Sequence, residues 1–126
     1  MTEATEQFFE TLPARAPQVL RAPVGGTLRI DLSDGHSTAH WVIRMRPGNA
    51  EVSQGPDEAD AIWYCGVDLF ERLVTGRAQA LAALFRNEST YTGNVVLLLA
   101  FRRFFPPAPG TRDPREVARE HVRRAR

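Results

Sequence analysis

Apolar and polar residues alternate along several short stretches of this chain, which is typical of half-buried β-strands. Leu28, Ile30 and Leu32, for example, alternate with polar neighbours. Turn-forming residues at 33–36 and 47–49 separate the first three stretches, which predicts an antiparallel meander. The third stretch is short and polar, so we expect it at the sheet edge. The predicted strands cover residues 27–32, 38–46, 50–54, 59–65 and 89–92.

Other stretches place apolar residues three and four positions apart, as amphipathic helices do. The predicted helices cover residues 8–20, 68–75, 78–85 and 94–105. In the first, Pro13 and Pro17 lack the N–H donor that a helix uses, which predicts a break or restart near Pro13. The third presents Leu81, Leu84 and Phe85 as its apolar side. The last is apolar almost all round, so we expect other elements to cover most of its sides.

Composition limits the class of protein. The chain has 126 residues, 43% of them apolar, which suits one domain with its own core. Cys65 is the only cysteine, which excludes an internal disulfide and multi-cysteine zinc sites. No lysine is present, so Schiff-base chemistry is excluded. The first ten residues carry three glutamates and no arginine, unlike a signal peptide, and we expect a cytoplasmic protein without a membrane span.

The end of the chain differs from the rest in charge. Residues 106–126 hold six arginines against three acids and begin with a proline-rich stretch. We therefore predict a domain over residues 1–105, then a linker and a basic helix over 106–126. Arg115, Arg119 and Arg123 would share one face of that helix, which favours transient contact with an anionic membrane. The charge is too modest and too interleaved with glutamates to predict a nucleic-acid partner.

The order of these elements and three sequence stretches resemble the sterol carrier protein 2 (SCP2) lipid-transfer family, in its stand-alone bacterial type. The stretches are ADAIWY at 59–64, VDLFERLVTGR at 67–77 and STYTGN at 89–94, and the resemblance extends over residues 8–105. It implies an α/β (α+β) fold with a five-stranded mixed sheet, helices over one face and an apolar tunnel between them. Family members usually have glycine where this chain has Asn87.

The resemblance implies binding or transfer of an apolar ligand (fatty acyl, sterol-like or polyketide-like) in an internal cavity, with no cofactor. Leu98, Phe101 and Phe105 are predicted to form a lid over the cavity. The predicted ligand-binding residues are Phe8, Phe9, Trp41, Ile43, Met45, Trp63, Phe70, Leu73, Leu81, Phe85, Tyr91, Leu98, Phe101 and Phe105. Residues of these types at these spacings also form ordinary cores, so the prediction depends on the resemblance.

Two other functions stay open. An enzyme of secondary metabolism, a cyclase or isomerase, would use Tyr64, Tyr91 and Cys65 beside the same cavity. An interaction module would act through the basic tail. Either would need its own observation.

The polar residues near the first turn give only weak support for acid–base chemistry or for a metal site. His36 and His40 are four residues apart, but on a turn and a strand this spacing does not make a metal pair. Alternation places Asp31 and His40 on the face away from the core, where we expect solvent, and Asp34 lies in the turn. We therefore predict no metal ligand and no catalytic residue.

Overall fold

The computed structural model describes residues 2–21 and 23–106. In this part of the chain, an N-terminal helix precedes four strands, and the remaining helices and one further strand follow. The predicted basic helix and nearly all of the predicted linker lie outside the described residues. The elements are α1 (Glu3–Val19), β1 (Gly26–Ser33), β2 (Thr38–Arg46), β3 (Asn49–Gln54), β4 (Ala61–Gly66), α2 (Val67–Val74), α3 (Ala80–Phe85), β5 (Ser89–Gly93), α4 (Val95–Phe101) and a 3₁₀ helix η1 (Arg102–Phe104).

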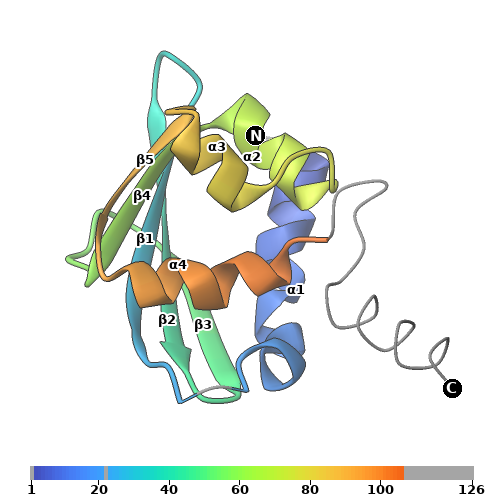
Figure 1. The fold of residues 1–126 in the computed structure, drawn as a ribbon, viewed down its shortest axis with the longest axis vertical. Coiled ribbons are helices and arrows are strands. Elements are labelled where there is room, and N and C mark those ends of the chain that lie inside the picture. The colour runs from blue at the N-terminus through green and yellow to red at the C-terminus, as the bar shows by residue number, and fades with distance from the viewer. Residues whose placement is uncertain (1, 22, 107–126) are drawn as a thin grey trace, which may run out of the picture.

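Five strands form one mixed sheet in the order β3-β2-β1-β4-β5. The pairs β1–β2, β2–β3 and β4–β5 are antiparallel, whereas β1 and β4 are parallel. Figure 1 shows the helices gathered against one face of this sheet. The predicted α+β fold class is therefore confirmed, and so is the meander with its third strand at the edge.

α1 is one continuous helix although it contains Pro13 and Pro17, so the predicted break near Pro13 is wrong. Each proline removes a backbone hydrogen bond. The helix persists because it buries one apolar face along most of its length, and the gain from that face outweighs the missing bonds. Thr2 caps its start by accepting the N–H of Thr5 at 3.3 Å. The buried face consists of Phe8, Phe9, Leu12 and Ala16.

α3 presents a different side to the core than its pattern predicted. The helix begins at Ala80, two residues later than expected, and its buried residues are Ala80 and Ala83. Leu81 and Leu84 are half-buried, whereas Phe85 is 82% exposed. Successive helix residues are rotated by about 100°, so Phe85, two positions after Ala83, points almost directly outward. The inward position predicted for Phe85 is wrong.

α4 is covered on one side only. Leu97, Leu98 and Phe101 are buried, but Val95 and Leu99 are exposed. The expectation that other elements cover most of this helix is therefore wrong within the described residues. In residues 2–21 and 23–106, no helix is long and apolar enough to span a bilayer.

Two backbone positions near β5 require unusual conformations. Gly93 has φ +99, and a β-carbon there would collide with the carbonyl oxygen of Asp60. Asn87 has φ 59, in the left-handed region that favours glycine and that asparagine tolerates. Asn87 therefore adopts a backbone conformation that a glycine at this position would also allow.

Candidate functional site

Most residues predicted to bind ligand lie on the covered face of the sheet or on the helices above it. Leu81, Tyr91 and Phe105 are partly buried. Phe85 is on the surface and cannot form part of an internal wall. The buried members are Phe8, Phe9, Trp41, Ile43, Met45, Trp63, Phe70, Leu73, Leu98 and Phe101.

Aromatic rings fill the centre of this layer. Phe9 is stacked between Trp41 and Phe70, with ring centroids 4.1 Å and 5.3 Å away. Phe70 is fully buried. Such contacts stabilise a core beyond simple burial. A hydrocarbon guest entering this region would therefore have to displace rings. Edge-to-face contacts join Phe70 to Phe8, Trp63 and Phe105.

An open pocket of about 230 Å³ lies elsewhere, between the end of α1, the segment that follows it, and α4. In Figure 1 these segments occupy the lower half of the molecule, with α4 passing across the front of the sheet. The lining of the pocket is mostly apolar and includes two arginines from η1. It can therefore take a hydrocarbon chain and place a negative group beside a guanidinium. The lining residues are Val19, Leu20, Val24, Val96, Leu99, Ala100, Arg102 and Arg103.

None of the predicted ligand-binding residues lines this pocket. Leu98 and Phe101, two of the predicted lid residues, belong to the same helix but to its buried side. The missed signal was the apolar character of α4 all round its axis. We interpreted it as a helix covered on most sides, whereas its second apolar side faces the pocket.

The two tryptophans of the covered face differ in hydrogen bonding. The Nε1–H of Trp63 donates to the Ser89 hydroxyl at 3.0 Å. The Nε1 of Trp41 is buried without a partner among the described residues. A buried donor without an acceptor is unfavourable, and most such groups in proteins are paired. Trp41 thus provides an unused donor inside the aromatic cluster.

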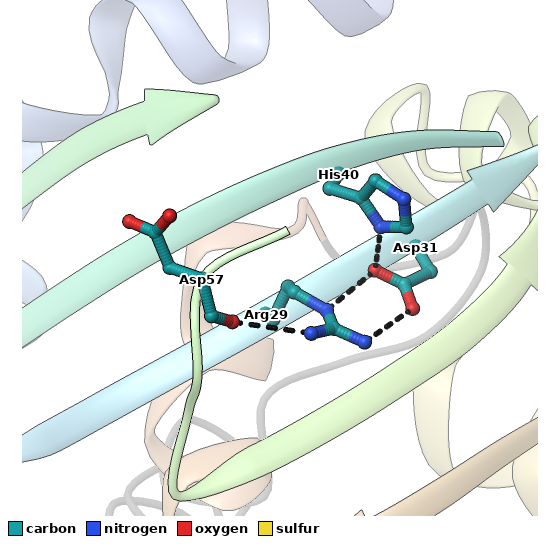
Figure 2. Close-up of polar contacts among 4 residues, drawn as sticks. All are labelled: Arg29, Asp31, His40 and Asp57. Atoms are coloured by element: carbon teal, nitrogen blue, oxygen red, sulfur yellow. Dashed lines mark hydrogen bonds and ion pairs between the residues drawn. The ribbon is translucent and has the colours of Figure 1, made fainter. Parts of the chain in front are cut away.

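The open face of the sheet carries an ionic network, and Figure 2 shows the part of it formed by Arg29, Asp31, His40 and Asp57. Asp31 accepts two hydrogen bonds from Arg29, at 2.9 and 3.1 Å, and contacts the Nδ1 of His40 at 2.7 Å. Arg29 also donates to the backbone carbonyl of Asp57, and Arg44 pairs with the Asp57 carboxylate at 3.0 Å. The network therefore links β1, β2 and the segment before β4.

The charge state of Asp31 follows from these partners. Burial raises the pKa of its carboxyl, but the hydrogen bonds with Arg29 and His40 outweigh burial and leave the pKa below its ordinary value. Asp31 is therefore held as a carboxylate on the face predicted for it, away from the pocket, but its side chain is buried there by its partners, so the solvent expected around Asp31 is wrong.

The other residues considered for acid–base or metal chemistry do not join this network. His36 is exposed in the turn after β1, where its backbone N–H donates to Asp34 at 2.8 Å. In the part of the chain that the structure describes, no group of three or more His, Cys, Asp or Glu could hold a metal ion.

The residues considered for the enzymatic alternative lie on both faces. Tyr64 is 47% exposed, on the face opposite its buried neighbours. Burial raises the pKa of the Cys65 thiol to about 12 and that of the Tyr91 hydroxyl to about 12, so both are protonated at neutral pH. The Tyr91 hydroxyl donates to the carbonyl of Asn94 at 2.6 Å. The structure therefore does not assemble the three around one cavity.

Comparison with known proteins decides the family. The sequence model of the SCP-2 sterol transfer family matches residues 6–106. The chain belongs to this family. A search of curated proteins gave no match.

Solved structures share the family fold. Sterol carrier protein-2 from Aedes aegypti, in complex with the C16 fatty acid palmitate, has a TM-score of 0.66 at 18% identity, covering 82% of this chain and 96% of that chain. Palmitated sterol carrier protein 2-like 2 from the same mosquito gives 0.65 at 17%, covering 81% and 92%. The apo form of sterol carrier protein 2 from Yarrowia lipolytica gives 0.59 at 21%, covering 76% and 88%. The predicted family is confirmed.

Proposed function

We propose that this protein binds and transfers an apolar ligand with a negative head group, of which a fatty acid is the simplest example. The observation that carries the proposal is the pocket between α1 and α4, whose lining is mostly apolar and includes Arg102 and Arg103. An apolar lining favours a hydrocarbon chain, and a guanidinium pairs with a carboxylate through charge-assisted hydrogen bonds. Two similar structures, from Aedes aegypti, contain palmitate, which supports the fatty acyl class over sterol-like or polyketide-like ligands.

Burying hydrocarbon supplies most of the affinity, at roughly 0.8 kcal/mol per methylene. A pocket of about 230 Å³ is smaller than most ligand sites, so we infer that it takes only part of a long chain. The remainder would follow the buried side of α4, past Leu98 and Phe101, with the partly buried Phe105 moving aside. In this proposal the predicted lid residues are the inner part of the path.

A displacement assay tests the proposal. A fluorescent acyl probe is bound to the purified full chain, and palmitate is added as competitor. We expect palmitate to release the probe, and we expect Ala100→Trp, which fills the pocket, to weaken probe binding roughly tenfold or more.

The matched control is Phe85→Trp, which introduces the same side chain at an exposed position away from the pocket. It should bind the probe like the unmodified chain, and circular dichroism should show both variants folded. Failure of palmitate to compete would contradict the proposed function. Equal binding by Ala100→Trp and the control would place the ligand elsewhere.

No contact among the described residues favours the enzymatic alternative. Contact of the basic tail with an anionic membrane, the absence of a nucleic-acid partner and a cytoplasmic location stay predictions of the sequence.

A further inference from the structure

Exposed apolar side chains of α4 lie at the pocket and next to it. Val95, Val96 and Leu99 of α4 are 52%, 47% and 40% exposed, although all three are large and hydrophobic. Val96 and Leu99 also line the pocket, so the apolar lining continues onto the outer surface. Clustered exposed apolar residues mark interaction surfaces more often than single ones do.

Arginines border this apolar surface. Arg21 follows the pocket residue Leu20, and Arg46 precedes the turn whose Gly48 N–H donates to the Leu20 carbonyl at 2.6 Å. None of the bordering arginines forms an ion pair with a residue that the structure describes. No acidic residue lies in α4 or η1, and the exposed Asp60 beside the start of α4 uses its carboxylate to accept the Thr27 N–H at 2.8 Å. The bordering arginines, all exposed, are Arg21, Arg46, Arg102 and Arg103.

The opposite end of α1 has the opposite charge. Glu3, Glu6 and Glu10 are exposed in its N-terminal half. In Figure 1 the N-terminus lies at the top, whereas the end of α1 and the β2–β3 turn lie at the bottom. An anionic surface would therefore attract the pocket end of α1 and repel the N-terminal half of this helix.

We propose that the docking end, formed by Val95, Val96 and Leu99 with the four bordering arginines, binds the surface of an anionic lipid bilayer. The apolar residues enter the boundary between headgroups and acyl chains, and the arginines pair with lipid phosphates. The inference rests on the proposed function, because a ligand then passes between bilayer and pocket without crossing water. A bilayer fits better than a protein partner because it offers both phosphates for the bordering arginines and hydrocarbon at the opening of an apolar pocket.

Vesicle sedimentation with the full chain tests the proposal. Vesicles contain either phosphatidylcholine alone or an equal mixture of phosphatidylcholine and phosphatidylglycerol. We expect binding to the mixed vesicles that falls as sodium chloride is raised, because salt screens the arginines. Equal binding to both vesicle types, or binding to neither, would overturn the proposal.

Two variants at exposed apolar residues test whether vesicle binding needs the docking end or only any exposed apolar side chain. Val95→Asp places a charge on α4 outside the pocket lining, and Phe85→Asp places the same charge on the more exposed apolar residue of α3. We expect Val95→Asp to weaken vesicle binding roughly tenfold or more and Phe85→Asp to leave it unchanged. Equal loss in both would overturn the proposal.

A pair of arginine variants tests the charges. Arg21→Glu with Arg46→Glu should weaken binding about fivefold or more per arginine, whereas the same change at the exposed Arg77 and Arg86 should have a much smaller effect. Equal effects from the two pairs would show attraction by net charge alone and would overturn the assigned orientation.

Two further measurements identify the cause of a negative result. Palmitate should displace the probe from Val95→Asp, without vesicles, as well as it does from the unmodified chain. If palmitate does not displace the probe from the unmodified chain, the proposed function itself has failed. Replacing Arg115, Arg119 and Arg123 by glutamine in the full chain tests the tail. If this abolishes vesicle binding while Val95→Asp does not, the tail is the membrane contact and the docking end is not.

Discussion

The two faces of the sheet consist of alternate residues of the same strands, yet different forces hold them. On the covered face, Leu28 and Ile30 are completely buried beneath helices. On the open face, the intervening Arg29 and Asp31 form ion pairs, and Asp31 is 93% buried without a helix above it. On the covered face, side chains are buried by apolar contacts with the helices. On the open face, Asp31 is buried by the polar side chains around it. The two faces should therefore respond differently to mutation, salt and pH.

The largest expected effect is on the covered face. Phe70→Ala should lower the free energy of unfolding by about 3–5 kcal/mol, because it removes a fully buried ring that contacts four other rings. Urea denaturation measures the loss. Phe85→Ala, at the exposed aromatic position, should change stability by less than about 0.5 kcal/mol. Similar losses in both would contradict the burial that distinguishes them.

A polar contact on the covered face should give the next largest effect. Ser89→Ala leaves the Nε1–H of Trp63 buried without an acceptor, and we expect a loss of about 1–3 kcal/mol. The adjacent Thr90 is exposed on the other face, so Thr90→Ala is the control and should change stability far less. If the two variants unfold at the same urea concentration, the Trp63 bond contributes nothing.

Asp31 provides the pH-dependent test of the open face. Asp31→Asn should lower stability by about 1–2 kcal/mol at pH 7, because it removes the charge that Arg29 binds. The pKa of Asp31 is lower in the folded than in the unfolded chain, so its stabilisation is present above the unfolded value and is lost as pH falls through the folded value.

The stability difference between the unmodified chain and Asp31→Asn should therefore shrink as the pH is lowered from about 5 towards 2. Urea denaturation across this range measures it. A difference that stays constant would show that proton binding at Asp31 does not affect folding.

The smallest expected effect is at the edge of the same network. Arg44 and Asp57 form an exposed ion pair, with side chains 43% and 50% exposed. Arg44→Gln should cost less than about 1 kcal/mol, and the loss should diminish in high salt. A loss of stability as large as that of Asp31→Asn would mean that the exposed pair Arg44–Asp57 stabilises the fold as much as the buried contacts of Asp31 do.

The sheet could be predicted well because each strand repeats one local rule. Alternation placed Trp41, Ile43 and Met45 on one side of β2, and the structure confirms both that side and the strand bounds. The contact between Asp31 and His40 was also accessible, because the turn centred on Gly35 and His36 sets the register that pairs them. We predicted their common face but not their contact.

The helices were harder to predict because tertiary packing decides which side is buried. Periodicity favoured the large residues of α3, but the structure buries Ala80 and Ala83 and leaves Phe85 in solvent. The pocket was missed for a related reason. The sequence shows that α4 is apolar all round, but only the position of the end of α1 shows which side remains open.

The two prolines of α1 have a consequence for the pocket wall. The half of the helix that carries Phe8 and Phe9 is anchored in the ring cluster, whereas the half that ends at Val19 follows Pro13 and Pro17. Those residues cannot donate to the preceding turn, so the second half can bend with fewer hydrogen bonds to break. The pocket wall formed by Val19 and Leu20 is therefore supported by fewer backbone hydrogen bonds than the half of the helix that lies in the ring cluster.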